Sequence, residues 1–204
     1  MTKREEPAPE GALRADAARN RERVLSVARE CLARGDASLQ MNQIAREAGV
    51  GVGTVYRHFP TRQELLEELV NEHVQGLLDH ARAAEDAGEP GAGLRRFLGA
   101  ALELLLADIG LAEVLNAPRD ANSRTARLKS ELFAATTRLL DAARREGSVR
   151  AELGVDDLQR LMCGVEHAAR IGGGGRALAE RYLNVLLDGL RPPPPGRARR
   201  GRGR

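Results

Sequence analysis

The sequence is poor in aromatic side chains. It has no Trp, two Tyr and three Phe among 204 residues, and its apolar residues are mainly Leu, Ala and Val. Aromatic and β-branched residues favour sheets, whereas Leu and Ala favour helices. Hydrophobic residues make up 42% of the chain, which is enough to bury a core. The composition therefore predicts an all-α globular fold.

Long hydrophobic runs are also missing. No run approaches the roughly 20 residues that a membrane-spanning helix needs, and the first ten residues mix charge with proline instead of forming a signal-peptide core. We therefore expect a cytoplasmic protein without a membrane partner. The two cysteines, Cys31 and Cys163, lie in helical patterns with no Cys or His nearby at metal-ligand spacing. We expect both to be small buried hydrophobes, and no metal or cofactor.

Catalytic motifs are absent as well. The glycine run Gly172 to Gly175 lacks the Lys-Ser/Thr that completes a phosphate-binding loop, and no Ser/His/Asp set or His/Glu metal cluster has a recognisable spacing. An enzyme is therefore the less favoured alternative, and it would require convergent ionisable groups in a cleft.

The net charge of +3 conceals an uneven distribution. Six arginines and no acid lie in residues 191–204, so the rest of the chain carries a net charge of about −3. Overall basicity therefore does not indicate nucleic-acid binding. The four prolines Pro192 to Pro195 and the Arg/Gly residues after them predict a disordered tail, which could add non-specific phosphate contacts.

Apolar spacing and Gly or Pro breaks divide the chain into helices. Residues 1–14 are expected to form a disordered arm, and a first helix to run from about Ala15 to Gly35. Thr61 and Glu64 form a capping box that starts a long helix, and residues 88–93 form a loop. The remaining helices are predicted at about 44–48, 53–58, 63–87, 94–107, 111–116, 123–146, 155–171 and 176–190.

Two short helices joined through Ala48-Gly49-Val50 have the properties of a helix-turn-helix. A small residue lies where the helices touch, a glycine allows positive φ, and an apolar residue anchors the turn. The string from Gln43 to Leu66, QIAREAGVGVGTVYRHFPTRQELL, resembles the DNA-binding signature of TetR (TetR/AcrR) family transcriptional regulators. This resemblance is specific over residues 24–69, and beyond them it rests on length and helix count.

The resemblance implies about nine helices in two parts. Residues 15–62 would form a three-helix DNA-binding head, and residues 63–190 a ligand-binding and dimerisation domain, with helix 63–87 as connector. The third helix would enter the major groove. Gly51, Val52 and Gly53 would allow close approach, Val52 would suit a thymine methyl group, and Arg57 could bind guanine in a bidentate manner.

Other residues of the head are expected to hold DNA without reading bases. Thr54, Tyr56 and His58 match family positions that bind the DNA backbone, and Arg62 is expected to contact phosphate. Asn42 and Gln43 could reach phosphate or an adenine edge. Val24, Leu25, Leu32, Ile44, Val55 and Phe59 are expected to form the core of the head.

The last two helices have wide apolar faces, which in the family form a four-helix bundle between two copies. The candidate dimer residues are Leu158, Leu161, Val165, Leu178, Tyr182 and Leu186. A homodimer would read a near-palindromic operator, with its heads in grooves about 34 Å apart.

An unknown small-molecule effector is also expected from the resemblance. Its pocket would be lined by Phe97, Leu102, Leu105, Leu115, Phe133, Leu140 and Met162, with Glu166 and His167 as polar groups. The alternative is that most of the apolar residues are simply core and that Glu166 and His167 are a polar pair at the surface or at a dimer interface. The expected function is a ligand-relieved repressor. The alternative is a helical adaptor or ligand sensor that does not bind DNA.

Overall fold

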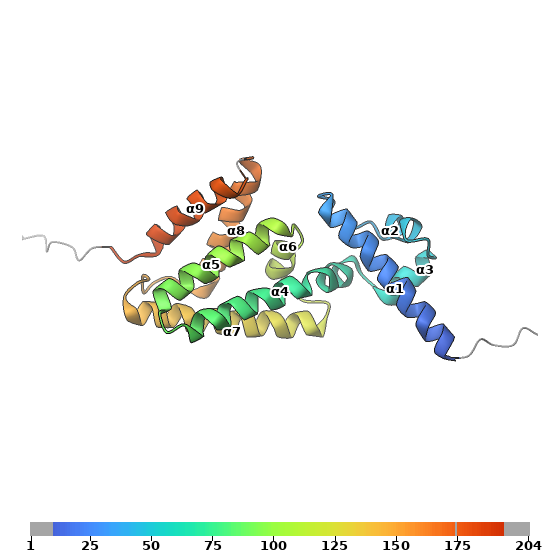
Figure 1. Cartoon of the computed structure of the whole chain (residues 1–204), viewed down its shortest axis with the longest axis horizontal. Helices are drawn as coiled ribbons and strands as arrows, with labels where there is room; N and C mark the ends of the chain where they lie inside the picture. The colour runs from blue at the N-terminus through green and yellow to red at the C-terminus, as the bar shows by residue number, and fades with distance from the viewer. Residues whose placement is uncertain (1–9, 174, 194–204) are drawn as a thin grey trace, which may run out of the picture. The chain divides into compact units, whose positions relative to one another are not determined.

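The computed structural model describes residues 10–173 and 175–193, and every regular element in them is a helix (Figure 1). The helices are α1 (Glu10–Ala33), α2 (Met41–Glu47), α3 (Val52–His58), α4 (Arg62–Asp86), α5 (Pro90–Ala107), α6 (Leu111–Asn116), α7 (Ser123–Glu146), α8 (Val155–Ile171) and α9 (Gly175–Leu190). The predicted all-α fold class is confirmed.

Contacts divide the chain into two compact units. The first contains the residues up to Asn71 together with Asp108–Ala126, and the second contains Glu72–Ala107 together with the residues from Arg127 onward. The predicted boundary between residues 62 and 63 falls within the first of these units. The loop after α4 connects two helices of the second unit. Helix α6 and the start of α7 belong with the head.

The head is built from three helices around a small core. Helix α1 packs on α2 and α3, which also pack on each other. Five of the six predicted core residues are buried, namely Val24, Leu25, Ile44, Val55 and Phe59. The sixth, Leu32, is only half-buried. Burying each of these large side chains contributes about 1.5–3 kcal/mol, which fixes the position of the short helices α2 and α3.

The second unit is a larger helical bundle. Helices α8 and α9 pack on each other, and both pack on α5 (Figure 1). The buried residues of α9 are Ala179, Leu183, Leu187 and Leu190. They recur at the spacing of one helix face, so the opposite side of α9 is left for other contacts.

Helix ends agree with the sequence where a strong local signal exists. The helices 111–116, 123–146 and 155–171 have the predicted bounds. The amide of Glu64 donates to Thr61 Oγ1 at 3.1 Å, which is the Thr61 half of the predicted capping box. Helix α4 ends before Gly88, whose φ of +70° is the left-handed conformation that terminates helices.

Three helices begin three or more residues earlier than predicted, and one of them is α2, which starts at Met41 and not at Ile44. Helix α1 starts at Glu10, so residues 10–14 of the expected arm are helical. Helix α5 starts at Pro90, inside the expected loop, because proline is well suited to the first turn of a helix. The rest of the arm (1–9) and the end of the tail (194–204) lie outside the described residues.

Other features of the described residues bear on chemistry. No helix in these residues is both long and apolar enough to cross a membrane, and no three His, Cys, Asp or Glu side chains there could share a metal ion. Cys31 is buried as predicted, and its burial raises the pKa of the thiol. Cys163 is only half-buried, which differs from the prediction.

Candidate nucleic-acid interface

The turn between α2 and α3 is held by an arginine of α1. Arg23 Nε donates to the carbonyl oxygen of Ala48 at 2.9 Å, and Nη2 donates to that of Gly49 at 2.6 Å. Gly49 has a φ of +62°, and a Cβ atom there would lie 3.1 Å from Arg23 Nη2. The turn therefore requires glycine both for its conformation and for the close approach of the guanidinium group.

Helix α3 has one buried and one exposed face. Val55 is completely buried, and Phe59 directly after the helix is 3% exposed, which anchors α3 to the head. Val52 and Tyr56 are 43% and 46% exposed, although large apolar and aromatic side chains usually avoid water. Arg57 is exposed beside them. A short helix held by its inner face and presenting this outer face can enter a groove.

The other predicted DNA contacts in α2 and α3 differ in accessibility. Gly51, Gly53 and Asn42 are exposed, whereas Gln43, Thr54 and His58 are half-buried. The Gln43 amide also donates to Glu47 Oε1 at 2.7 Å. The exposed backbone around Gly51 and Gly53 leaves room for close approach, while Gln43 would first have to release Glu47.

Unpaired positive charge lies on this surface. Arg46 at the end of α2 and Arg57 in α3 are exposed, and neither has a polar partner within the described part of the chain. Arginines in folded proteins commonly pair with carboxylates, and an unpaired guanidinium group is available for phosphate or for a guanine edge.

Arg62 has different partners from those we expected. Its Nε donates to the Ser38 carbonyl at 2.9 Å, and its Nη1 and Nη2 donate to Glu113 Oε1 and Oε2 at 2.6 and 2.9 Å. Nη2 also donates to the carbonyl of Ala37. Most of its donors are therefore occupied, and in this structure Arg62 joins α4 to the loop before α2 and to α6.

Electrostatics strengthens this link within the first unit. The hydrogen bond from Arg62 is the main cause that holds the pKa of the Glu113 carboxyl below its ordinary value, and the same bond raises the pKa of Arg62. Both groups stay in their charged forms over a wide range of pH.

Two residues of the head were missed from the sequence. Arg23 holds the helix-turn-helix turn, and Arg21 lies 5.3 Å from the centre of the Phe59 ring while pairing with Glu68 at 2.7 Å. Arg23 lies 25 residues before Ala48, and Arg21 lies still further before Phe59. Only the abundance of arginine in the middle of α1 could have pointed to them.

The residues predicted to line an effector pocket fall in both units. Phe97, Leu102, Leu105, Leu140 and Met162 are buried in the second unit, whereas Leu115 belongs to the first unit. Phe133 is 45% exposed, and His167 is also exposed. Glu166 is buried, but Arg170 pairs with it and with the Leu105 carbonyl.

The predicted dimer residues divide between core and surface. Leu158 is 3% exposed, so it belongs to the core of its own chain. Leu161 is 41% exposed, and Val165, Leu178, Tyr182 and Leu186 are half-buried. Val185 and Ile171, which we did not include, are 67% and 75% exposed. The accessible apolar surface of α8 and α9 is therefore shifted from the predicted set.

Comparison with protein families agrees with this geometry. Residues 24–69 match the model described as bacterial regulatory proteins of the tetR family, and residues 89–192, half of the chain, match the C-terminal domain of SbtR-like transcriptional regulators. The chain belongs to the TetR family. As a TetR-family protein it is a DNA-binding transcriptional regulator whose helix-turn-helix comprises α2 and α3.

Individual relatives cover different parts of this TetR-family protein. A helix-turn-helix-type transcriptional regulator of Staphylococcus aureus is 32% identical over 75 residues, which are 36% of this chain and only 40% of the relative. A TetR transcriptional regulator from Streptomyces coelicolor is 31% identical, with a TM-score of 0.53, covering 85% of this chain and 99% of that one.

A more distant structure shows the fold alone. The transcriptional regulator FadR from Bacillus subtilis, solved in complex with stearoyl-CoA, is 20% identical with a TM-score of 0.53, covering 83% of this chain and 98% of that one.

Proposed function

We propose that this TetR-family regulator is a homodimeric repressor that binds a near-palindromic operator and is released by a small-molecule effector. The observation that carries the DNA-binding part is the outer face of α3, where Val52, Tyr56 and Arg57 are exposed on a helix anchored by buried Val55. Repression and dimerisation are typical of the family.

Base reading is assigned to the exposed residues of α3. Arg57 donates two parallel hydrogen bonds to a guanine edge, and the Val52 methyl groups contact a thymine methyl group. Tyr56, Thr54 and His58 bind the DNA backbone and fix the register, with Asn42 and Gln43 at the start of α2 as further contacts. Arg46 joins this set because it is exposed and unpaired.

Arg62 is given a different role in the proposal. Because its guanidinium group is bound to Ser38 and Glu113, we assign it to holding the loop before α2 rather than to phosphate. This loop contains Leu39, which is buried although its φ is +45°. Such a conformation is unfavourable for leucine, so the surrounding contacts must maintain it.

The accessible apolar surface of α8 and α9 supports a dimer. Leu161, Val185 and Ile171 are exposed on these two helices. Several exposed apolar side chains on neighbouring helices indicate an interface more strongly than a single exposed apolar residue does. Two copies related by a two-fold axis would present two identical heads, which explains a palindromic site.

The effector part of the proposal follows the family and the fold relative that holds stearoyl-CoA. A release of about 100-fold requires roughly 2.7 kcal/mol of differential binding between two conformations, which is within the usual range of coupling energies. Helix α4 is the element that such a change would act on, because its residues are divided between the two units.

Selection of bound sequences from a random duplex pool tests the DNA-binding part. The double variant Tyr56→Phe, Arg57→Ala removes two of the proposed DNA contacts. The matched control is Arg29→Ala on α1, because Arg29 is also an exposed arginine but pairs with Glu22. We expect a two-fold symmetric site for the native protein and Arg29→Ala, and its loss in the double variant.

The adaptor alternative predicts a different result. If no sequence is enriched at moderate salt and the double variant behaves like the native protein, the head does not read DNA and acts through protein contacts. If the selection gives a symmetric site but sedimentation shows a strictly monomeric protein, only the dimer part of the proposal is wrong.

A further inference from the structure

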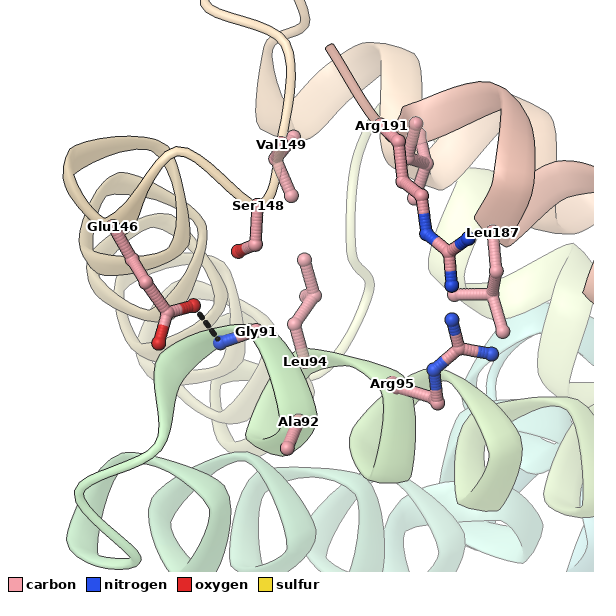
Figure 2. A pocket seen from close by; sticks show the side chains of 10 residues that line it. Gly91, Ala92, Leu94, Arg95, Glu146, Ser148, Val149, Leu187 and Arg191 are labelled. Carbon is pink, nitrogen blue, oxygen red and sulfur yellow. Dashed lines mark hydrogen bonds between the residues drawn. The ribbon is translucent and has the colours of Figure 1, made fainter. Parts of the chain in front are cut away.

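A pocket in the second unit lies where the start of α5, the end of α7 and the end of α9 meet (Figure 2). Its volume is about 320 Å³. Four buried side chains supply its apolar surface, namely Leu94, Val149, Leu187 and Leu190. None of the residues predicted from the sequence to bind an effector lines it.

Two guanidinium groups lie on one side of this pocket. In Figure 2 the side chains of Arg95 and Arg191 extend toward each other. Arg95 is exposed and has no polar partner among the residues that the structure describes. Within the described residues, the only carboxylate that pairs with Arg191 is that of exposed Asp188, near the end of α9, at 3.3 Å. Two like charges in this position repel each other unless an anion binds between them.

Arg95 differs in this respect from its neighbour. Arg96, the next residue of α5, is within 3.8 Å of Glu89 and does not line the pocket. The sequence thus places two adjacent arginines on α5. Within the described parts of the chain, Arg96 has a carboxylate partner and Arg95, which lines the pocket, has none.

The other side of the pocket has polar groups that are already bound. Glu146 Oε2 accepts the Gly91 amide at 2.8 Å, and the Ser148 hydroxyl donates to the Ala143 carbonyl at 2.9 Å. The negative charge of Glu146 disfavours an anion on that side. Apolar Leu94 and Val149 lie between Glu146 and the arginines in Figure 2. This arrangement gives a ligand one orientation.

We propose that this pocket binds a small carboxylate with a short apolar tail. The carboxylate accepts hydrogen bonds from Arg95 and Arg191, and the tail lies on Leu94, Val149, Leu187 and Leu190. Planar guanidinium groups match the geometry of a carboxylate, and a bare anion would leave the apolar surface in water. This ligand class would be that of the effector in the proposed function, so the inference rests on that proposed function. Binding to the free protein is nevertheless measured without DNA, so the two can fail separately.

The test is a titration of the full-length protein with hexanoate, followed by nitrogen-15 NMR. For a ligand of this size we expect a dissociation constant of about 1 mM, with saturable shifts of the amides of Gly91, Leu94 and Val149. Acetate lacks the tail and hexylamine has the opposite charge, so both should bind at least about tenfold more weakly.

Variants at the two adjacent arginines identify the site. Arg95→Leu should raise the dissociation constant for hexanoate about tenfold, Arg95→Lys should recover part of the affinity, and Arg96→Leu should behave like the native protein. Because Arg95 is exposed, the melting temperature of Arg95→Leu without ligand should be unchanged.

Three results would overturn the proposal. They are equal shifts with hexanoate and hexylamine, equal losses in Arg95→Leu and Arg96→Leu, and no saturable shift at these amides up to about 20 mM hexanoate. An intact operator selection together with any of them would leave DNA recognition standing.

Discussion

Arg57 and Tyr56 are exposed side chains on α3 that are not expected to stabilise the fold of the free protein. Arg57 has no polar partner among the described residues, and Tyr56 is 46% exposed. Substituting an exposed residue of this kind usually changes the free energy of unfolding by less than about 0.5 kcal/mol. Their contribution should therefore be visible in DNA binding and not in stability.

Arg57→Ala is expected to weaken binding to the selected operator by about 1–3 kcal/mol and to relax the base preference at one position of each half-site, because a bidentate guanine contact is lost. Fluorescence anisotropy with single-base variants of the operator measures both effects. Arg46→Ala is the comparison, since a phosphate contact weakens all sequences equally and lowers the salt dependence. A uniform loss for Arg57→Ala would reassign it to phosphate.

The Arg62–Glu113 pair contributes to stability in a manner that depends on pH. Glu113 has a pKa below its ordinary value of 4.5 because Arg62 donates to its carboxylate. A carboxyl with a lowered pKa in the folded state stabilises the protein above the unfolded pKa, and this contribution is lost as the pH falls through the folded pKa. The pair is partly exposed, so its contribution is about 0.5–1 kcal/mol.

Glu113→Gln should therefore lower the free energy of unfolding by about 0.5–1 kcal/mol at pH 7, and the difference from the native protein should shrink below pH 4. Urea unfolding at a series of pH values measures this. Glu131→Gln, at another exposed arginine pair, controls for the loss of a surface charge. A difference that stays constant down to pH 3 would show that the pair has no such role.

At the level of elements, α4 and the start of α7 are joined by a buried carboxylate. Glu67 is completely buried, and its two oxygens accept the amides of Ala121 and Asn122 at 2.8 and 2.7 Å, just before α7 begins. Gln63 donates to the same carboxylate at 2.8 Å. Glu67 thus supplies acceptors to amides at the N-terminal end of α7, where a negative charge is favourable.

Glu67→Gln should destabilise the protein by about 2–4 kcal/mol, because an amide NH₂ replaces an acceptor and faces a buried backbone donor. Thermal and urea unfolding measure the loss. Glu68→Gln is the matched variant, since Glu68 is adjacent, half-buried and paired with Arg21 at the surface, and it should cost less than about 1 kcal/mol. Equal effects of the two variants would contradict the role of Glu67.

The turn between α2 and α3 depends on Gly49. Alanine there would adopt an unfavourable positive φ, and its Cβ would lie within 3.1 Å of Arg23 Nη2. Gly49→Ala is expected to cost about 1–2 kcal/mol of stability and to reduce operator affinity, whereas Gly53→Ala, in open space within α3, should not destabilise the protein. Denaturant unfolding of both variants tests this. A stable Gly49→Ala protein would show that the turn tolerates other residues.

At the level of the whole molecule, apolar side chains of α8 and α9 are exposed on the surface of the single chain. On α9, Leu183, Leu187 and Leu190 face the core of their own chain, whereas Val185 lies on a different face and is 67% exposed. Leu161 on α8 is exposed as well. Apolar side chains on the surface of two adjacent helices would be covered in a symmetric pair.

Val185→Glu should therefore weaken dimerisation by at least about tenfold, since it places a charge in an apolar interface. Sedimentation at micromolar concentration measures the association, and Asn184→Glu is the control, because the adjacent residue lies about 100° around the helix. A native protein that is already monomeric, or equal effects of the two variants, would remove this surface from the proposed interface.

Much of this protein can be predicted from the sequence by itself. The all-α fold, the bounds of helices such as 111–116 and 155–171, and the helix-turn-helix at Gly49 follow from signals within a few residues of the chain. The exposure of Tyr56 and Arg57 on α3 follows too. The motif places Val55 and Phe59 in the core of the head, which leaves Tyr56 and Arg57 on the opposite, outer face of the helix.

Only the tertiary structure decided the roles that depend on distant partners. Arg62 looked like a phosphate contact, but it pairs with Glu113, 51 residues away. Phe133 was predicted to line a pocket, and only the structure shows that its side chain is 45% exposed. The pocket beside Arg95 combines residues from three helix ends. Local spacing of apolar residues determines which face of a helix is buried. Which residues pack against that face depends on how distant segments of the chain are arranged in the tertiary structure. A pattern of a few residues does not contain that information.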